Sequence, residues 1–522
     1  MQVAEKSFEK VEFGEEESDD GGIPSEYRGT ASDRKDMTTL GKKQVLRRNF
    51  RFITMLGFAS TAMATWEILL PLFTFVLTDG GTGDLFWGFI AAGIGMSLVY
   101  ASIAEMASMC PTSGGQYHWV SEFAPPKIQK FLSYIVGWLC AIAWQVYLGG
   151  ACFMVGTIIQ GLIVLNLEDY VWKNYHGTLL TIAVISFAVL FNTALASRLP
   201  LIESICLVLH TVGFFAIVIP LWVMGSHSDA HVLLDFTNYG GWPSTGLSAM
   251  IGLTSPISVL TGFDCSVHMS EEIQDASITL PRAIMWSVVP NTALGFIMAI
   301  TLIFTLGDID NILATATGQP FIQVFFNATQ SLAATNAMTA IVVVLLICCG
   351  ISELATSSRQ IWSFARDRGL PASDWLSKVT PGWNIPLRAV CVSLVVTTLL
   401  ACINLGSSTA LNAINSLGGV SILGSYFITI SCLIWRRAFG RPLPPRRWSL
   451  GKFGMGINIC AILFLAPVWF FAFWPLAIPV NPTNMNWSST MFGSIISIAL
   501  VDYFVQARHQ YVGPVVQVIR DE

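Results

Sequence analysis

The sequence predicts an all-α polytopic membrane protein with about twelve transmembrane helices. Of its 522 residues, 53% are hydrophobic and only 12% are charged, and the mean hydropathy is +0.61. A soluble domain is about 25% charged, so these charges are too few to cover the roughly three soluble domains that this length would otherwise give. Apolar runs long enough to cross a bilayer also recur from residue 53 onward. With 11 cysteines and a net charge of −5, a disulfide scaffold and a nucleic-acid partner are both disfavoured.

Residues 1–40 are predicted to form a disordered, acidic tail on the cytoplasmic side. Eleven acidic residues lie between Met1 and Asp36, and aromatic residues are few there. Such a segment buries too little apolar surface to fold by itself. It does not show the basic, apolar and small-residue regions of a signal peptide. A short basic stretch from Lys42 to Arg51 follows, directly before the first apolar run.

Twelve apolar segments are candidates for membrane spans, because a helix needs about 20 mostly apolar residues to cross a core about 30 Å thick. They are 53–77, 85–109, 131–165, 178–197, 200–224, 247–270, 284–306, 337–358, 389–405, 409–435, 456–476 and 490–506. Isolated Pro and Gly residues inside them are compatible with membrane helices. Removing any one span from this set would reverse the side on which all later loops lie.

The basic residues support twelve spans and predict the orientation. If the N-terminus lies inside, 27 of the 28 Lys and Arg residues fall in inner segments, and only Lys173 falls in an outer loop. Cytoplasmic loops carry such an excess of basic residues. We therefore expect both termini in the cytoplasm. The sequons at Asn327 and Asn486 fall in outer loops, which makes both candidates for glycosylation.

Four ionisable side chains lie well inside predicted spans: Glu67, His210, Asp264 and Glu353. A carboxylate at bilayer depth costs at least about 2.5–3.5 kcal/mol, so such groups usually face a cavity or a pathway. Imidazole titrates near neutral pH and can relay protons. We expect Glu67, His210 and Glu353 to be candidates for ion coupling and Asp264 for substrate binding. The alternative is that each is a structural group paired with a neighbour.

Two spans contain residues that favour an interrupted helix. In 247–270, Pro256 lacks a backbone donor, and Gly262 stands directly before Phe263 and Asp264. The span 53–77 carries a run of small and hydroxyl residues. Discontinuous helices bind substrate and ions near the midplane of secondary transporters, although small residues also form helix-packing faces. These spans are the first and the sixth, as expected if the first ten form two repeats.

Three motifs occur in one order along the chain. They read AEMASMCPTSGGQYHW (104–119), TGFDCSVHMSEE (261–272) and SRQIWSFARDRGLP (358–371). They resemble the signatures of the amino acid–polyamine–organocation (APC) superfamily, in its fungal amino acid/choline transporter branch, and the resemblance covers about residues 50–506.

The resemblance implies a transporter core over residues 41–435, with five-plus-five inverted repeats (LeuT-like) at about 50–225 and 247–435. Residues 436–506 would add two helices, and 507–522 would be a cytoplasmic tail. Substrate would bind between the first, third, sixth, eighth and tenth spans. The substrate-binding residues that carry over are Ala59, Ser60, Thr61, Ala62, Ser258, Thr261, Gly262, Phe263 and Asp264. Members often have a glycine-rich break in the first span, where this chain reads Ala-Ser-Thr-Ala.

The predicted function is that of a permease in the plasma membrane that moves an amino acid or a related amine, such as GABA or choline, by alternating access. Either Asp264 or Glu67 would favour the substrate's ammonium, and Trp66, Trp144, Tyr147 and Phe263 are candidates to line the cavity. We expect protons rather than sodium to be coupled, and we expect no cofactor and no metal site. Transport of a specialised-metabolite precursor or product and a non-transporting nutrient sensor remain alternatives. An intramembrane enzyme is disfavoured because no catalytic motif lies in a span.

Overall fold

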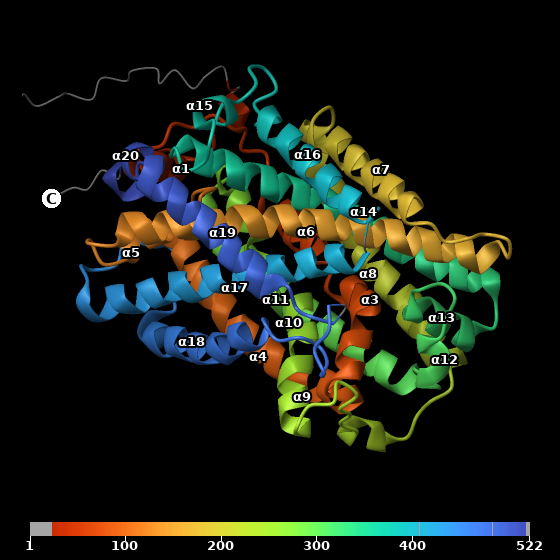
Figure 1. Ribbon diagram of the computed structural model, residues 1–522. Helices are drawn as coiled ribbons and strands as arrows, with labels where there is room; N and C mark the ends of the chain where they lie inside the picture. Colours follow the sequence, from red (N-terminus) through yellow and green to blue (C-terminus); the bar gives the residue numbers. More distant parts are fainter. Residues whose placement is uncertain (1–22, 24, 407, 483, 518–522) are drawn as a thin grey trace, which may run out of the picture.

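The computed structural model describes residues 23, 25–406, 408–482 and 484–517 (Figure 1). Throughout these residues the chain is helical, with isolated β-bridges and no strand, as the sequence predicts. Eleven helices of this described part are long and apolar enough to cross a membrane, and Leu387–Ile403 is a shorter apolar helix of 17 residues. At about 1.5 Å per residue it is about 26 Å long, slightly less than a bilayer core.

Each predicted span coincides with one helix or with a set of consecutive helices. In chain order these are α2 (Phe52–Met63) with α3 (Thr65–Thr78), α4 (Gly81–Met109), α6 (Gln129–Asn166), α7 (Asn174–Asn192), α8 (Leu199–Met224), α9 (Thr245–Gly252) with α10 (Thr254–Val259) and the 3-10 helix η4 (Phe263–Glu272), α11 (Ala276–Thr305), α14 (Leu332–Arg366), α16 (Leu387–Ile403), α17 (Ser408–Phe439), α18 (Gly454–Phe471) and α19 (Ser488–Asp502). Shorter helices lie between and beside them: α1 (Ala31–Thr39), α5 (Gln116–Phe123), α12 (Ile309–Leu313), α13 (Pro320–Thr329), α15 (Ser373–Leu376) and α20 (Arg508–Gln510).

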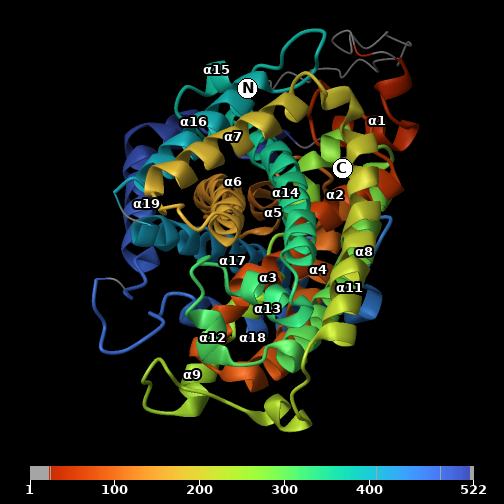
Figure 2. The same cartoon turned by 90° about the vertical axis from the view of Figure 1, so that its right-hand side faces the viewer.

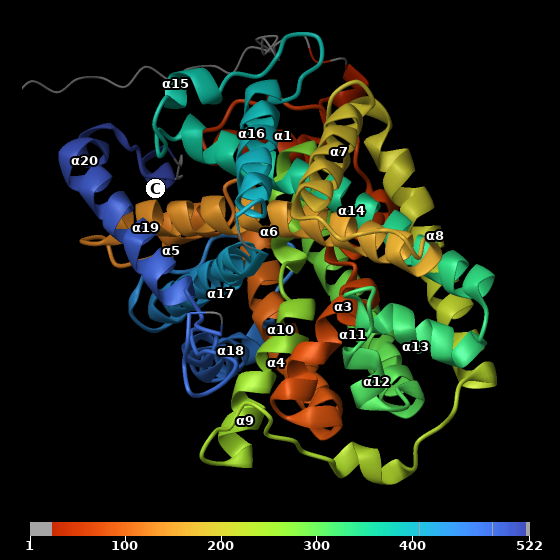
Figure 3. The ribbon, with the colours of Figure 1, turned by 45° about the vertical axis from the view of Figure 1, so that its right-hand side comes forward.

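Helix α6 lies in the middle of the bundle. It packs against α14, α17, α5 and α7. Figure 2 shows it nearly end-on with these helices around it, and Figure 3 shows it crossing the bundle above α3 and α4. The interrupted helices α2/α3 and α10/η4 adjoin this group through α14, which packs against α6 and also contacts α2, α3 and η4.

The first interruption follows Met63. Ala64 has a left-handed backbone (φ 40°, ψ 46°) and separates α2 from α3. A non-glycine residue there is strained by about 1–2 kcal/mol, so the surrounding packing must hold it. The sequence placed the break at Ala59–Ala62, but these four residues are helical and the break lies two residues further along.

The second interruption lies where the sequence predicted it. Gly262 has φ 118°, in the region that favours glycine, and it separates α10 from η4. The Tyr100 hydroxyl of α4 accepts a hydrogen bond from the Gly262 N–H (2.7 Å) and donates one to the Leu260 carbonyl (3.0 Å). One side chain thus satisfies backbone groups that the broken helix leaves without partners. Pro256, by contrast, lies within α10 and does not end it.

The predicted acidic tail over 1–40 differs from the structure where it is described; residues 1–22 lie outside the described residues. Helix α1 begins with a capping box, in which Thr30 Oγ1 accepts from the Asp33 N–H (3.2 Å) and Asp33 Oδ2 accepts from the Thr30 N–H (2.8 Å). Met37 and Leu40 are buried. The Thr-x-x-Asp pattern was the signal for this helix.

Candidate functional site

The Asp264 carboxylate lies directly after the second helix break and is fully buried. Its Oδ1 accepts a hydrogen bond from the Tyr426 hydroxyl of α17, and its Oδ2 accepts one from the Gln116 amide of α5. The His268 Nε2 atom, one turn further along η4, is 3.9 Å from Oδ2. Because both oxygens already have donors, Asp264 holds α5, α17 and η4 together.

Aromatic rings surround this carboxylate. Tyr100 is 5.2 Å from Phe263 and 5.9 Å from Tyr426, measured between ring centroids. Trp144 of α6 is 5.8 Å from His268, and Tyr147 is 6.0 Å from Trp144. Sequence reasoning missed Tyr100 and Tyr426, which carry no local signal in an apolar span.

The predicted residues of the first helix make polar contacts both with neighbouring helices and within α2. Ser60 Oγ accepts from the Asn291 amide of α11 (3.1 Å), and Thr61 Oγ1 donates to the Gly57 carbonyl (2.8 Å). The Ala62 carbonyl accepts from the Cys349 thiol of α14 (3.2 Å). Together with Ala59 these residues are buried and connect α2 to its neighbours.

The predicted residues of the sixth span divide into two groups. Thr261, Gly262 and Phe263 are buried at the break beside Asp264. Ser258 is exposed, and its hydroxyl donates to the Thr254 carbonyl (2.7 Å). The structure therefore brings Thr261 to Asp264 together and places Ser258 outside this group.

Glu67 and His210 form a buried pair. The distance between Glu67 Oε1 and His210 Nδ1 is 2.6 Å, and both side chains are almost fully buried. The ring of Trp66 lies 5.8 Å from that of His210. The sequence identified both residues separately, but only the packing of α3 on α8 joins them.

Glu353 is one of three buried glutamates of the interior, with Glu67 and Glu203, whose Oε2 atom is without a hydrogen-bond partner in the described part of the chain. Its side chain on α14 is only 5% exposed. The charge of Glu353 is within electrostatic range of Tyr147 and Cys152 on α6. Glu67 also contacts His210 and Glu203 also accepts from Ser352, whereas Glu353 has the Cys349 thiol, a weak donor, beside it. A buried carboxylate with an open acceptor is expensive unless something pairs with it, and Glu353 is the least satisfied of the three.

Two motif arginines of α14 hold the end of η4. The Arg366 guanidinium forms a bidentate ion pair with Glu271, in which Nη1 donates to Oε2 (2.8 Å) and Nη2 donates to Oε1 (2.7 Å). Arg359 Nε donates to Glu272 Oε1 at 2.8 Å. Paired donors of this kind fix geometry as well as charge, so these residues join two helices rather than face the Asp264 group.

The segment that precedes α2, from Lys42 to Arg51, is attached to the same two places, the end of η4 and the end of α14. Lys42 forms a buried ion pair with Asp367, whose Oδ2 also accepts from the Tyr117 hydroxyl (2.9 Å). Burial lowers the pKa of the Lys42 ammonium, and the charge of Asp367 partly opposes that shift. Arg48 is 3.3 Å from Asp33 and donates to backbone carbonyls of the η4 region. The N-terminal segment is thus fastened to η4 and to the end of α14.

The two sequons have different surroundings. Asn486 Nδ2 donates to two carbonyls, those of Ala472 (2.9 Å) and Trp474 (3.0 Å). Asn327, on α13, is half-buried, and its Nδ2 donates to Asn311 Oδ1 (3.1 Å). Because an N-linked glycan replaces one amide hydrogen, a glycosylated Asn486 could keep only one of its two hydrogen bonds.

Comparisons with known proteins agree on one family. The family model for amino acid permeases matches residues 50–497. The chain is 31% identical over 440 residues to a Macrophomina phaseolina protein named as an amino acid/polyamine transporter, covering 83% of this chain and 97% of that protein. It is 28% identical over 495 residues to amino-acid permease 2 of Neurospora crassa, covering 93% and 90% of the two chains. It is also 28% identical over 447 residues to the choline transporter of Saccharomyces cerevisiae, covering 85% and 78%.

Proposed function

Because the chain belongs to the amino acid permease family, we propose that it moves an amino acid or a related small amine, such as GABA or choline, across the plasma membrane. Membership of that family makes it an integral membrane transporter and not an enzyme. The observation that carries the proposal is the pair of helix interruptions, at Ala64 and Gly262, with the open carboxylate of Glu353 on the adjoining α14.

The broken helices would receive the substrate's carboxylate. The start of α3 and the start of η4 both follow an interruption, and a helix start has free N–H groups and the positive end of the helix dipole. Anions bind at such positions without a basic side chain. This fits the absence of Lys and Arg from the neighbourhood of Gly262 in the described part of α10 and η4.

Glu353 would receive the substrate's ammonium. The sequence favoured Asp264 or Glu67 for this role, but Gln116 and Tyr426 already occupy Asp264, and His210 occupies Glu67. Glu67 also keeps its Oε2 open, but Glu353 has neither an imidazole nor a hydroxyl donor among the described residues. A quaternary ammonium such as choline would in addition gain from ring faces, for which Trp144 and Tyr147 are the candidates on α6.

Protons are the coupling ion that we propose. The Glu67–His210 pair is buried and in direct contact, and histidine is a common proton-shuttling residue. Sodium sites need free oxygen ligands. The α14 hydroxyls of Thr356 and Ser358 donate to the carbonyls of Ser352 (3.1 Å) and Leu354 (2.7 Å). Their oxygen lone pairs stay available to a cation, so sodium is the alternative coupling ion.

The transport cycle that we propose is alternating access between two inverted repeats, about 50–225 and 247–435. The ion pairs of Arg366 with Glu271 and of Lys42 with Asp367 would break when the cytoplasmic side opens. The excess of basic residues on one side supports a cytoplasmic location for both termini.

Radiolabelled uptake in yeast cells that lack their own permeases tests this function against a panel of amino acids, GABA and choline. Glu353→Gln should lower the uptake efficiency about 10- to 100-fold, since a hydrogen bond to a charged group is worth about 1.5–3 kcal/mol. Glu203→Gln is the matched control, because Glu203 is also buried with its Oε2 atom open, but it lies on α8 and its Oε1 atom accepts from Ser352 (2.8 Å). Unchanged kinetics of Glu353→Gln at equal surface abundance would remove it from the site. Uptake of nothing in the panel would favour the nutrient-sensor alternative or a specialised metabolite as substrate.

Coupling is tested in the same cells. Substrate addition should acidify the cytoplasm, and a protonophore should abolish accumulation. Uptake that follows external sodium and survives the protonophore would contradict proton coupling.

A further inference from the structure

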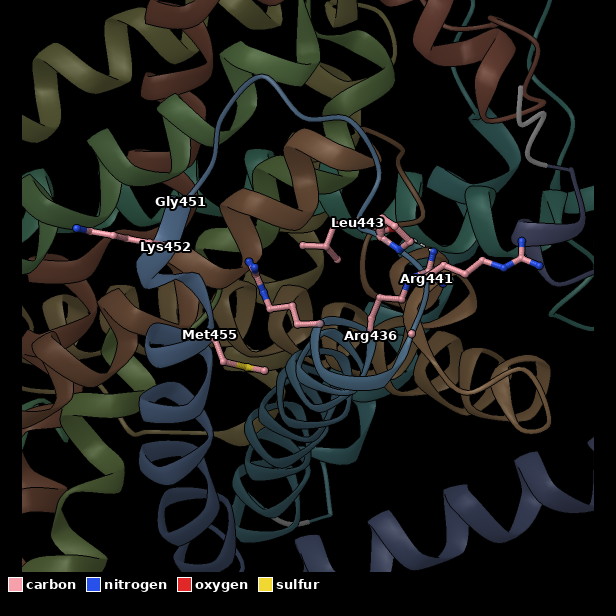
Figure 4. Close-up of a pocket in the computed structure, with 9 residues that line it drawn as sticks. Arg436, Arg441, Leu443, Gly451, Lys452 and Met455 are labelled. Carbon is pink, nitrogen blue, oxygen red and sulfur yellow. Dashed lines mark hydrogen bonds between the residues drawn. The ribbon is translucent and has the colours of Figure 1, made fainter. Parts of the chain in front are cut away.

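A basic pocket of about 430 Å³ lies where α17 ends and α18 begins, away from the helix breaks. The loop between these two helices closes one side of it (Figure 4). Its lining residues are Arg436, Arg437, Gly440, Arg441, Pro442, Leu443, Gly451, Lys452 and Met455. Four of these nine residues are cations and none is acidic, in a chain whose net charge is −5.

The two inner arginines are held in position. Arg437 pairs with the buried Glu105 and donates to the Asn458 side chain (2.9 Å), and Arg436 is 3.5 Å from Glu122. Glycines let these side chains lie close to the backbone: a Cβ at Gly440 would be 2.5 Å from Arg436 Cδ. The inner wall is therefore preformed, and the charges of its two arginines are balanced by Glu105 and Glu122.

The two outer cations lie on the rim. Arg441 and Lys452 are exposed, and neither forms an ion pair with a described residue. In Figure 4 their side chains extend outward on opposite sides of the pocket. Both are long and flexible, so a multiply charged anion in the pocket could draw them together at little cost in strain.

Exposed aromatic residues flank the same pocket. Phe439, at the end of α17, is 80% exposed, and Phe453, just before α18, is 65% exposed. The Lys452 ammonium lies 5.2 Å from the centroid of the Phe453 ring. These residues stand at the ends of two membrane-spanning helices, the depth at which aromatic rings meet lipid and cations meet headgroups. The pocket therefore borders the bilayer surface rather than open solvent.

We propose that this pocket binds the phosphate-bearing headgroup of an anionic phospholipid in the cytoplasmic leaflet. The pocket is large enough for a headgroup, since small-molecule sites start at about 300 Å³. The neighbouring loops belong to the side that carries 27 of the 28 basic residues, and basic pockets on the cytoplasmic side attract anionic lipids. The two phenylalanines would contact the acyl chains, which distinguishes a lipid from a free phosphate.

Binding of a short-chain phosphatidylinositol phosphate to the purified full-length protein tests the proposal. The double variant Arg441→Gln/Lys452→Gln leaves the Glu105 and Glu122 pairs intact and should weaken binding about 30-fold, because each cation near a charged surface contributes about fivefold. Lys127→Gln/Lys378→Gln is the matched control, since both lysines are exposed and lie in loops on the same side. The control should bind like the wild type.

The soluble inositol phosphate is the second arm of the experiment. We expect it to bind more weakly than the lipid, and Phe439→Ser/Phe453→Ser should bring lipid and soluble headgroup to similar affinity. Equal affinity of the two ligands for the wild-type protein would overturn the lipid assignment in favour of a free phosphate. Equal lipid binding by the pocket variant and the control variant would overturn the site. Neither result depends on transport, so the outcome is separate from that of the uptake experiments.

Discussion

Replacing Lys42 by Met should release the N-terminal segment from the rest of the protein. The Lys42 and Asp367 side chains are 3% and 1% exposed, so their ion pair is a buried one. Removing one member of a buried pair destabilises by about 3–5 kcal/mol. Asp367 keeps the Tyr117 hydroxyl as a donor, so we expect the lower end, about 3 kcal/mol. Methionine fills much of the volume of the lysine stem, which keeps the packing loss small.

Hydrogen exchange measured by mass spectrometry reports this release directly. A change of about 3 kcal/mol corresponds to about a 150-fold faster exchange of the protected amides in residues 31–50. Lys35→Met is the control, because Lys35 lies exposed on α1 in the same segment; its exchange should remain that of the wild type. Equal exchange rates for Lys42→Met and Lys35→Met would refute the reasoning that the buried pair fastens this segment.

Two further predictions follow from groups outside the membrane-spanning helices. Burial raises the pKa of Asp79, and the hydrogen bond from the Ser248 hydroxyl (2.8 Å) partly opposes this shift. Folding therefore favours the protonated acid. The stability that this adds is present below the ordinary aspartate pKa of 3.8 and is lost as the pH rises through the raised pKa. Asp79→Asn should therefore raise the melting temperature at pH 7.5 by about 1–3 °C and flatten its pH dependence, and a melting temperature that falls at pH 7.5 would contradict this. For glycosylation, Asn327→Gln should remove a glycosidase-sensitive band shift and Asn486→Gln should not, because the Asn486 amide already donates both hydrogens; a shift that disappears only in Asn486→Gln would show the reverse.

Local sequence signals predicted the membrane helices well and the positions of their interruptions less well. Gly262 was identified because glycine tolerates a left-handed backbone. Ala64 was not, because alanine carries no such signal and adopts φ 40° only where its surroundings impose it. Ser258 was predicted for the site from its motif position, and the structure shows it exposed on α10, apart from the buried Thr261–Asp264 group. Helix α1 was missed because the acidic composition outweighed its capping box.

Sequence alone determined that this chain spans a membrane, because in lipid every backbone polar group must be satisfied within its own helix and only long apolar helices allow this. The excess of basic residues predicted the orientation for a similarly local reason. The tertiary structure decided which buried carboxylates have hydrogen-bond partners from distant helices. Gln116 and Tyr426 reach Asp264 across 148 and 162 residues of sequence, and His210 reaches Glu67 across 143. Only the packing of distant helices brings such partners together, and among the described residues it leaves Glu353 without an amide, hydroxyl or imidazole donor.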